Sequence, residues 1–394
     1  MFNAIGEKLE EKAMINFLQR FDANPFKVKF KDNEYIIGEG TPSFTVNMKE
    51  PIPVSKLMSS TSIALGEAYM DGILDIEGDL YDALNHFLGQ MDQFTTTGDV
   101  LNKLTHNPLS KKHQAEEVQS HYDIGNDFYS LWLDETMQYS CAYFKNPTDT
   151  LYEAQINKID RILEKLYLKE GLRLLDIGCG WGFLLIEAAK KYKIKGTGIT
   201  LSHEQYEKFQ QRIKENHLED YLEVRLMDYR DLPKSGLEFD RVVSVGMVEH
   251  VGRQNYQLFN DCVDSVLVKG GVFLLHFISG MDEKPGDAWM SKYIFPGGML
   301  PSLREMVADM TDDNFHVLDV ENLRIHYNLT LLEWDKNFRA QLPKIREKFD
   351  ERFIRMWDLY LNGCAAAFYN GMMDLHQILA TKGINNELPI TRWY

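Results

Sequence analysis

The stretch Leu174-Leu175-Asp176-Ile177-Gly178-Cys179-Gly180-Trp181-Gly182 decides the fold of this chain. Its apolar first half is typical of a buried parallel strand, and its glycines allow the backbone to approach a ligand closely. The residues that follow, 183–192, have the pattern of a helix. A strand that runs through a glycine-rich turn into a helix predicts a nucleotide-binding site.

The spacing of the glycines indicates which nucleotide the turn would hold. A dinucleotide fingerprint requires Gly-x-Gly-x-x-Gly, whereas the glycines here stand at positions 178, 180 and 182, after Asp176. This pattern resembles the first motif of Rossmann-type methyltransferases, whose acid and glycines hold the methionine part of S-adenosylmethionine. A glycine-rich turn alone would also suit an incidental loop, but its position between a strand and a helix favours a cofactor site.

Strands and helices alternate along the chain from residue 154 onward. Strands are predicted at residues 172–177, 196–200, 222–227, 241–245 and 272–277, with helical stretches between them and a long helix over residues 349–379. This alternation predicts a Rossmann-type α/β domain with a doubly wound, mostly parallel sheet. Residues 1–95 mix helical segments with alternating stretches such as 26–30 and 44–48, which predicts a smaller α+β domain. Residues 96–117 are polar and turn-rich, so we expect a linker there and the catalytic domain over residues 118–394.

The composition limits the possible functions. The 394 residues are 44% hydrophobic and 26% charged, as in ordinary globular proteins, and the net charge of -16 argues against a nucleic-acid binder with a basic face. The first residues lack the pattern of a secretory signal, and the apolar runs are too short to span a membrane, so we expect a cytoplasmic protein. The four cysteines, at positions 141, 179, 262 and 364, have neither metal-ligand nor disulfide spacing, so we expect reduced thiols and no metal site.

Polar residues follow the ends of four predicted strands. In an open α/β sheet the ligand lies beyond the carboxyl ends of the strands, so these residues are candidates for the site. They are Asp176 after the first strand, Thr200 and Leu201 after the second, Asp228 and Tyr229 after the third, and Glu249 after the fourth. The carboxylate of Asp228 could accept a hydrogen bond from an adenine amino group. Ser202 and Gln205 form a capping-box pattern at the start of the helix after the second strand.

His276 ends the fifth predicted strand inside an apolar run. If the fourth and fifth strands are neighbours, Glu249 and His276 emerge side by side beneath the transferred methyl group. Each also has a structural interpretation, because a histidine in an apolar run is commonly a hydrogen-bonded core residue and Glu249 could cap a helix that begins near Arg253. The aromatic residues of segments 121–128 and 138–144 leave a similar choice, between a lid over a cationic sulfonium and an aromatic core.

With these segments in view, the chain resembles the cyclopropane fatty acid synthase family, which includes the mycolic acid cyclopropane synthases. The matching segments lie in the family's order between residues 118 and 380; they are His121-Tyr122-Asp123, Gln138-Tyr139-Ser140-Cys141-Ala142-Tyr143, residues 174–182, Asp228-Tyr229-Arg230-Asp231, residues 244–252, Leu274-Leu275-His276 and Lys292-Tyr293-Ile294-Phe295-Pro296. The separate N-terminal domain resembles the long bacterial, phospholipid-modifying form, since the mycolic acid enzymes lack it.

The resemblance implies transfer of a methylene group from S-adenosylmethionine to a cis double bond in an acyl chain of a membrane phospholipid. The alkene would attack the methyl carbon, and a base would then remove a proton from the transferred methyl as the ring closes. In the family this base is a bound bicarbonate. The positions of its ligands carry over to Cys141 and Ile278, mainly through backbone groups, and to Glu249, His276 and Tyr327, through side chains.

The cofactor-contact positions of the family carry over in the same way. They are Tyr139, Ser140, Gly178, Thr200, Leu201, Gln205 and Tyr229. We add Asp176, Gly180 and Asp228 from the glycine turn and the strand ends. Most methyltransferases place an acid at the end of the second strand for the ribose hydroxyls, whereas this chain has Thr200 there and Gln205 is expected to help.

The resemblance also implies a phospholipid bilayer surface with unsaturated acyl chains as the partner, peripheral membrane association and a homodimer. We expect the N-terminal domain to position lipid or to form the dimer. One candidate membrane contact comprises Lys103, Lys111, Lys112 and His113, although a solvated linker suits the same residues. Two other functions stay open: methylation of a small amine or hydroxyl, and noncatalytic lipid binding on a methyltransferase scaffold.

Overall fold

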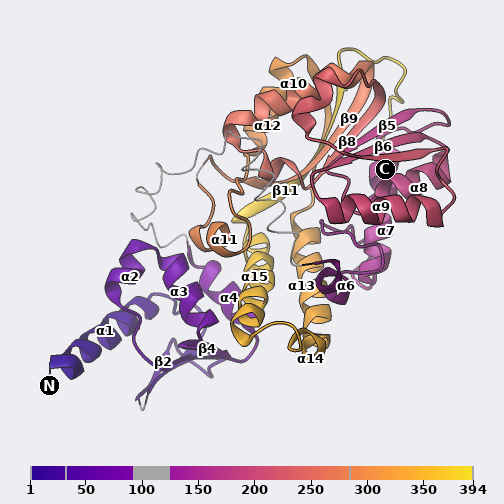
Figure 1. Cartoon of the computed structure of the whole chain (residues 1–394). Helices are drawn as coiled ribbons and strands as arrows, with labels where there is room; N and C mark the ends of the chain where they lie inside the picture. The colour runs from indigo at the N-terminus through magenta and orange to yellow at the C-terminus, as the bar shows by residue number, and fades with distance from the viewer. Residues whose placement is uncertain (1, 32, 92–124, 284, 393–394) are drawn as a thin grey trace. The chain divides into compact units, whose positions relative to one another are not determined.

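The computed structural model describes residues 2–31, 33–91, 125–283 and 285–392 (Figure 1). The predicted linker and the segment His121-Tyr122-Asp123 lie outside this part of the chain, as does the candidate membrane contact at residues 103–113. Contacts divide the chain into two compact units. Unit 1 comprises Met1–His106, Pro285–Pro296 and Leu331–Met372, and unit 2 comprises Asn107–Lys284, Gly297–Thr330 and Met373–Tyr394.

Unit 2 is built on a seven-stranded sheet. In the order of the sheet its strands are β10 (Phe315–Asn322), β11 (Met373–Lys382), β9 (Leu267–Gly280), β8 (Phe239–Val245), β5 (Arg173–Ile177), β6 (Lys195–Thr200) and β7 (Leu222–Leu226). The five strands from β9 to β7 run parallel, and β11 lies antiparallel to both β9 and β10. This is the mostly parallel sheet that the sequence predicts, and all five predicted strands are present.

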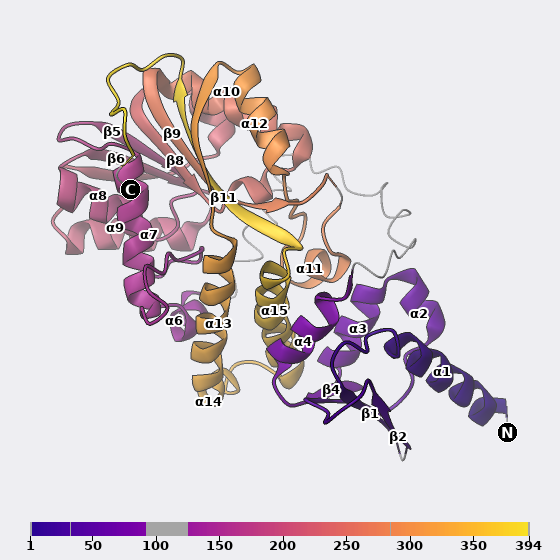
Figure 2. The ribbon, with the colours of Figure 1, turned by 180° about the vertical axis from the view of Figure 1, so that it is seen from behind.

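Helices cover both faces of this sheet (Figures 1 and 2). One face carries α7 (Leu151–Lys165), α8 (Phe183–Tyr192) and α9 (His203–Glu215), and the other carries α10 (Tyr256–Val266) and α12 (Leu303–Asp312). In β5, Leu174 belongs to the first core, whereas Leu175 and Ile177 belong to the second. Because successive strand residues point to opposite faces, an uninterrupted apolar strand serves both cores. Unit 2 also contains α6 (Asn126–Trp132) and the short 3₁₀ helices η3 (Tyr229–Lys234), η4 (Val248–His250) and η5 (Arg253–Asn255).

The prediction of one helix over residues 349–379 is wrong in its last third. The helix, α15 (Glu351–Tyr369), ends before Gly371, whose φ of +69° suits a chain reversal after a helix. Residues 373–382 then form β11 and enter the sheet between β9 and β10. The run mixes apolar and polar residues and is almost continuously buried, so its sequence has no periodicity that would assign it to a helix or a strand.

Unit 1 combines a four-stranded sheet with helices from distant parts of the chain. The sheet has the order β2 (Asn33–Ile37), β1 (Phe26–Phe30), β3 (Thr45–Met48) and β4 (Leu74–Glu77). The helices are α1 (Phe2–Leu18), α2 (Val54–Ser59), α3 (Thr61–Met70), α4 (Leu80–Leu88), α11 (Ala288–Tyr293), α14 (Leu342–Ile345) and α15, and α13 (Arg324–Ala340) runs from unit 2 into unit 1. α15 packs against α3 and α4, so residues well beyond 95 complete this unit.

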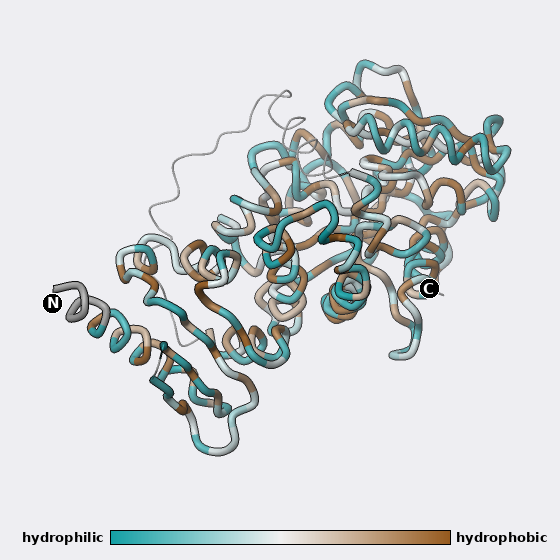
Figure 3. Tube along the Cα trace, turned by 60° about the horizontal axis from the view of Figure 1, so that its bottom comes forward, coloured by the Kyte–Doolittle hydropathy of each residue, from teal (hydrophilic) through white to brown (hydrophobic). Residues whose placement is uncertain are grey.

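Hydrophilic and hydrophobic residues alternate along the helices, as expected where one face is buried (Figure 3). Among the described helices, none combines the length and the apolar character that crossing a membrane requires.

Candidate active site

The glycine turn between β5 and α8 depends on backbone conformations that favour glycine. Gly180 and Gly182 have φ values of +53° and +80°. A Cβ atom on Gly182 would lie 2.0 Å from the ring of Phe209 in α9, so this position must lack a side chain for α8 and α9 to pack. A Cβ on Gly180 would meet nothing within 4 Å, because that face of the turn borders a pocket.

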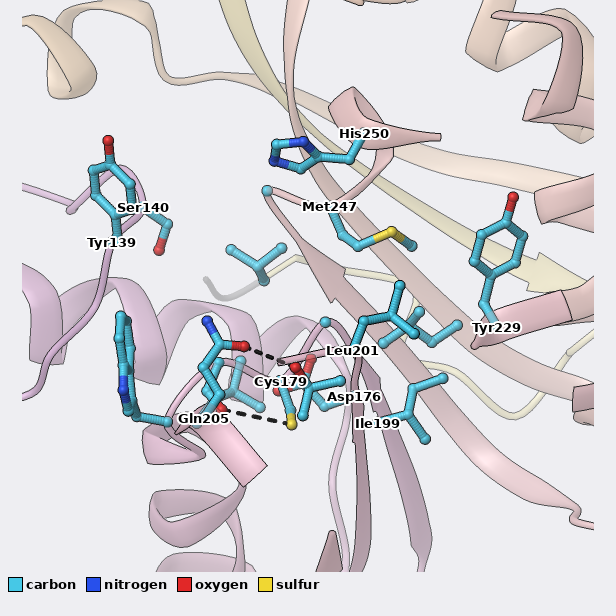
Figure 4. Close-up of a pocket in the computed structure, with 18 of the residues that line it drawn as sticks. Tyr139, Ser140, Asp176, Cys179, Ile199, Leu201, Gln205, Tyr229, Met247 and His250 are labelled. Carbon is cyan, nitrogen blue, oxygen red and sulfur yellow. Dashed lines mark hydrogen bonds between the residues drawn. The ribbon is translucent and has the colours of Figure 1, made fainter. Parts of the chain in front are cut away.

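A pocket lies at the carboxyl ends of β5, β6, β7 and β8, inside unit 2. All ten predicted cofactor residues line it: Tyr139, Ser140, Asp176, Gly178, Gly180, Thr200, Leu201, Gln205, Asp228 and Tyr229. Tyr139 and Ser140 lie on one side and Tyr229 on the opposite side, with Asp176 and Gln205 between them (Figure 4). The strand-end rule therefore brings these residues to one place, although their individual roles stay a prediction.

Asp176 is the acid at the base of this pocket. It is buried, its Oδ1 atom has no hydrogen-bond partner, and burial raises the pKa of its carboxyl to about 7. A buried acceptor without a donor costs free energy, so the site suits a ligand that brings a hydrogen-bond donor or a positive charge. The ammonium and sulfonium groups of S-adenosylmethionine meet that requirement.

Thr200 and Gln205 are linked directly in the pocket wall. The Thr200 hydroxyl donates to Gln205 Oε1 at 2.8 Å and accepts from the Ser202 backbone NH at 3.1 Å. Ser202 Oγ accepts from the Gln205 backbone NH at 3.3 Å, which is the first half of the predicted capping box. The second half is missing because the Gln205 side chain is held by Thr200 instead. The glutamine that would complete the helix cap thus faces the pocket.

Asp228 is already engaged by its neighbour Arg230. Asp228 Oδ1 accepts from the backbone NH and from Nε of Arg230, at 2.9 and 2.8 Å, and Oδ2 accepts from its Nη2 at 2.6 Å. Both side chains are 9% exposed. An adenine amino group that approached Asp228 would therefore share a carboxylate that is oriented by an arginine.

Side chains of helix α7 donate hydrogen bonds to the pocket segment 138–140. Gln155 donates to the carbonyls of residues 138 and 140, at 3.3 and 3.0 Å. Lys158 donates to Gln138 Oε1 at 2.6 Å and to Ser140 Oγ at 2.9 Å. Lys158 is 1% exposed, and burial lowers the pKa of its ammonium to about 8. Sequence reasoning missed this lysine because a charged residue in a helix normally indicates a solvated face.

The aromatic residues before β5 form a cluster that reaches the pocket. The rings of Tyr129 and Trp132 each lie 5.4 Å from that of Tyr139, and the ring of Tyr129 lies 5.9 Å from that of Trp181. Tyr129 and Trp132 are fully buried, whereas Tyr139 and Trp181 line the pocket. Of these four residues only Tyr139 belongs to a segment for which the sequence left open a lid or an aromatic core, and it lines the pocket, while residues 121–124 lie outside the described part of the chain.

The predicted anion ligands form a second group next to the pocket. Glu249, in η4, accepts a hydrogen bond from the Ile278 backbone NH at 2.7 Å. The helix that begins at Arg253 has Gly252 as its N-cap and no side-chain cap hydrogen bond, so the alternative interpretation of Glu249 as its cap is wrong. Its other oxygen, Oε2, is buried without a hydrogen-bond partner. Burial raises the pKa of this carboxyl to about 7.

His276 lies on β9 beside β8, as the sequence argument requires. It is 1% exposed, and its Nδ1 atom lies 3.1 Å from Nε2 of Gln377 on β11. Nε2 of His276 has no hydrogen-bond partner. Burial, assisted by the charges of Lys158 and Lys165, holds the pKa of this imidazole well below its usual range, so the ring is neutral.

The other two predicted anion ligands, Cys141 and Tyr327, are linked to this group through the backbone of Leu323. Cys141 is fully buried, its Sγ lies 3.9 Å from the Leu323 carbonyl, and the Tyr327 backbone NH donates to the same carbonyl at 3.1 Å. The Leu323 backbone NH donates at 2.7 Å to Leu375, which is paired in register with Ile278. Burial raises the pKa of the Cys141 thiol, so it is not an activated nucleophile. Within the described residues, none of the five predicted anion ligands lines the cofactor pocket itself.

Several pocket residues were not predicted. Met137, Trp181, Arg230, Met247 and His250 all line it. His250 stands beside Glu249 in the fourth strand-end segment, and burial lowers the pKa of its imidazole to about 4. The sequence prediction selected Glu249 and not His250, although a histidine after a strand end is also a candidate site residue.

Comparison with known proteins identifies the family. Residues 109–378 match the family described as mycolic acid cyclopropane synthetase, and residues 13–99 match a domain of unknown function. A probable fatty acid methyltransferase of Pseudomonas putida is 40% identical over 93% of this chain and 95% of its own length. The cyclopropane-fatty-acyl-phospholipid synthase of Escherichia coli K12 is 39% identical over 90% of this chain and 92% of its own length.

Solved structures agree with the sequence comparison. Mycolic acid cyclopropane synthase CmaA1, in a complex with SAH and CTAB, has a TM-score of 0.64 and 35% identity, and the match covers 68% of this chain and 98% of that one. The class I methyltransferase fold, the glycine turn and its pocket agree with that match. The chain therefore belongs to the mycolic acid cyclopropane synthetase family and is an S-adenosylmethionine-dependent methyltransferase.

Proposed function

We propose that this enzyme transfers a methylene group from S-adenosylmethionine to the cis double bond of unsaturated acyl chains in membrane phospholipids. The observation that carries the proposal is the pair of buried, unpartnered atoms next to the cofactor pocket: Glu249 Oε2, in η4 after β8, and His276 Nε2, on the neighbouring strand β9. The name of the E. coli relative, a cyclopropane-fatty-acyl-phospholipid synthase that aligns over 92% of its length, supports the choice of substrate.

The cofactor would occupy the pocket at the glycine turn. The ten lining residues named above would contact it, with Asp176 accepting from its methionine part and Thr200 and Gln205 near the ribose. When bound, S-adenosylmethionine supplies the carbon that becomes the ring methylene. Asp176 Oδ1, which lacks a donor in the protein, supports this placement.

The second group would hold bicarbonate. Glu249 Oε2 can accept from the hydroxyl of this anion, while His276 and the Tyr327 hydroxyl can donate to its oxygens, and backbone groups of Cys141 and Ile278 complete the site. When bound, bicarbonate would supply the base for the proton of the transferred methyl. A neutral donor and a carboxyl with a pKa of about 7 fit a singly charged anion better than they fit a metal.

The protein's own residues would control water and charge during the reaction. A cation on the acyl chain is captured by any nearby water, so the site has to be dry. Cys141 and His276 are at most 1% exposed, and Glu249 and Tyr327 are 8% exposed. Their burial supports a mechanism in which ring closure competes successfully with hydration.

Mass spectrometry of lipids tests this function. Unsaturated phospholipid vesicles incubated with the enzyme and S-adenosylmethionine should gain one methylene unit per converted double bond. Vesicles of fully saturated lipid are the control and should not change. No gain with unsaturated lipid, together with turnover of soluble amines, would refute the proposal and favour a small-molecule methyltransferase; no binding of S-adenosylmethionine in calorimetry would favour a noncatalytic lipid-binding protein.

We further propose that the enzyme works as a homodimer bound peripherally to the bilayer from the cytoplasm, with the N-terminal domain positioning lipid or forming the dimer. The basic residues at 103–113 are the proposed contact. Vesicle flotation compares the wild type with the double variant Lys111→Glu/Lys112→Glu; unchanged binding would exclude this patch. Sedimentation equilibrium measures the mass of the protein in solution, and a monomer mass at the concentration of the activity assay would exclude the dimer.

A further inference from the structure

Gln377 and His276 face each other across two neighbouring strands. β11 and β9 are antiparallel, and these two residues are paired in register. Both are 1% exposed, and Gln377 Nε2 lies 3.1 Å from His276 Nδ1. Gln377 is not among the predicted site residues, and it lies in the run that the sequence predicts as a helix.

The orientation of the Gln377 amide bears on which ring nitrogen of His276 carries the proton. In the structure Gln377 Nε2 faces His276 Nδ1, and Gln377 Oε1 is buried without a hydrogen-bond partner. An amide nitrogen only donates hydrogen bonds, so in this orientation Nδ1 is the acceptor. The ring is neutral and has one proton, which is therefore on Nε2. Nε2 is the atom without a partner in the protein. A buried N–H group without an acceptor is unfavourable, so this atom is set to donate to a ligand.

The surroundings of His276 suit an anionic ligand. The charges of both Lys158 and Lys165 act on the ring, and the Glu249 carboxyl follows the neighbouring strand. The opposite tautomer would present a lone pair at Nε2, which would repel an oxyanion. The direction of one amide group thus decides whether the histidine attracts or repels such a ligand.

We propose that Gln377 is a positioning residue that fixes His276 as the Nε2–H tautomer, so that His276 donates a hydrogen bond to a small oxyanion bound beside Glu249. This inference deepens the proposed function and rests on it only for the identity of the anion, bicarbonate. The tautomer itself is a property of the protein without ligand.

Nitrogen NMR of the full-length enzyme with ¹⁵N-labelled histidine measures the tautomer directly. The His276 signals are assigned as those lost in His276→Asn, and spectra are recorded in buffer depleted of bicarbonate. We expect Nδ1 of His276 to be unprotonated and Nε2 to be protonated. A protonated Nδ1 in the wild type would overturn the proposal.

Gln377→Met keeps the length of the side chain and removes both polar atoms. It should produce a mixture of the two tautomers and raise the bicarbonate concentration for half-maximal turnover roughly 2- to 10-fold, while S-adenosylmethionine binding stays unchanged. Thr381→Val removes a buried polar group from the same strand, away from His276, and should change neither quantity. An unchanged tautomer and an unchanged bicarbonate response in Gln377→Met would refute the role of Gln377.

The failure of the proposed function would look different. If wild-type turnover does not respond to bicarbonate, the anion has been misidentified, whereas the NMR result on the tautomer still stands or falls by itself. Thermal unfolding of each variant shows whether a lost activity reflects a lost fold.

Discussion

Replacing Glu249 with Gln should stabilise the ligand-free protein at alkaline pH while it removes most turnover. Glu249 is 8% exposed, and burial raises the pKa of its carboxyl from 4.5 to about 7. The Ile278 backbone NH stabilises one oxygen, but the other has no hydrogen-bond partner. An amide keeps the acceptor for Ile278 and cannot ionise, so the variant should avoid the cost of a buried charge.

The sign of the effect follows from the two pKa values. Because the folded-state value is higher than the unfolded value of 4.5, the unfolded chain releases this proton first, and wild-type stability falls as the pH rises from 4.5 to about 7. The loss of wild-type stability is about 1 kcal/mol at pH ~5, inside this range, and about 3 kcal/mol at pH ~8, above which it no longer changes. The Glu249→Gln variant does not titrate here, so its free energy of unfolding should exceed that of the wild type by these amounts.

Thermal and urea unfolding without cofactor, at both pH values, measure this difference. A gain of about 3 kcal/mol corresponds to roughly 6–12 °C for a domain of roughly 150–250 residues. Glu170→Gln, at an exposed position, is the matched control and should show no pH-dependent gain. If Glu249→Gln shows the same gain at both pH values, or none at the higher one, burial does not disfavour this carboxylate and the reasoning is refuted.

Three further predictions concern the cofactor pocket. Gly182→Ala should lower the free energy of unfolding by about 2–5 kcal/mol, since its Cβ would meet the Phe209 ring; Gly236→Ala, which has a similar φ and open space, should cost only about 1–2 kcal/mol in urea unfolding. S-adenosylmethionine should bind up to about tenfold more weakly for each pH unit below ~7, because binding favours ionised Asp176; calorimetry of Asp176→Asn should show no such pH dependence. Lys158→Met should weaken cofactor binding roughly 10- to 100-fold, because the pocket segment that this lysine holds loses two hydrogen bonds; unchanged affinity would contradict it.

The parallel part of the fold follows from the sequence because each strand is short and lies between a helix and a polar strand end. β5 is mostly apolar and buried on both faces, whereas the edge strand β7 alternates between buried and exposed residues, and both patterns indicate a strand. The cofactor pocket follows from the same rule. Asp176, Thr200 and Asp228 are far apart in the chain but share one edge of the sheet, since parallel strands place all their carboxyl ends together.

Strand β10 could not be recognised in this way because apolar side chains occupy its exposed positions and an acidic side chain occupies a half-buried one. Its exposed positions include Leu318 and Val320, at 38% and 39% exposure, whereas Glu321 occupies a half-buried position. Arg161 and Lys165 of α7 pair with that glutamate. Ion pairs with α7 thus replace apolar packing around Glu321. A sequence in which acidic residues take the buried positions and apolar residues the exposed ones does not indicate a strand with one buried face.

The proposed anion site depends on β11, a strand that runs antiparallel to its neighbours in the sheet. β11 is antiparallel, so its residues meet the end of β9 in mid-strand: Leu375 lies opposite Ile278 and Gln377 lies opposite His276. No rule based on carboxyl ends selects such positions. They become visible only when the last strand is placed between β9 and β10, and its mixed sequence does not indicate that place. His276 could therefore be selected from the sequence as a candidate site residue, whereas the residue that we propose to control its proton could be found only from the register of the sheet.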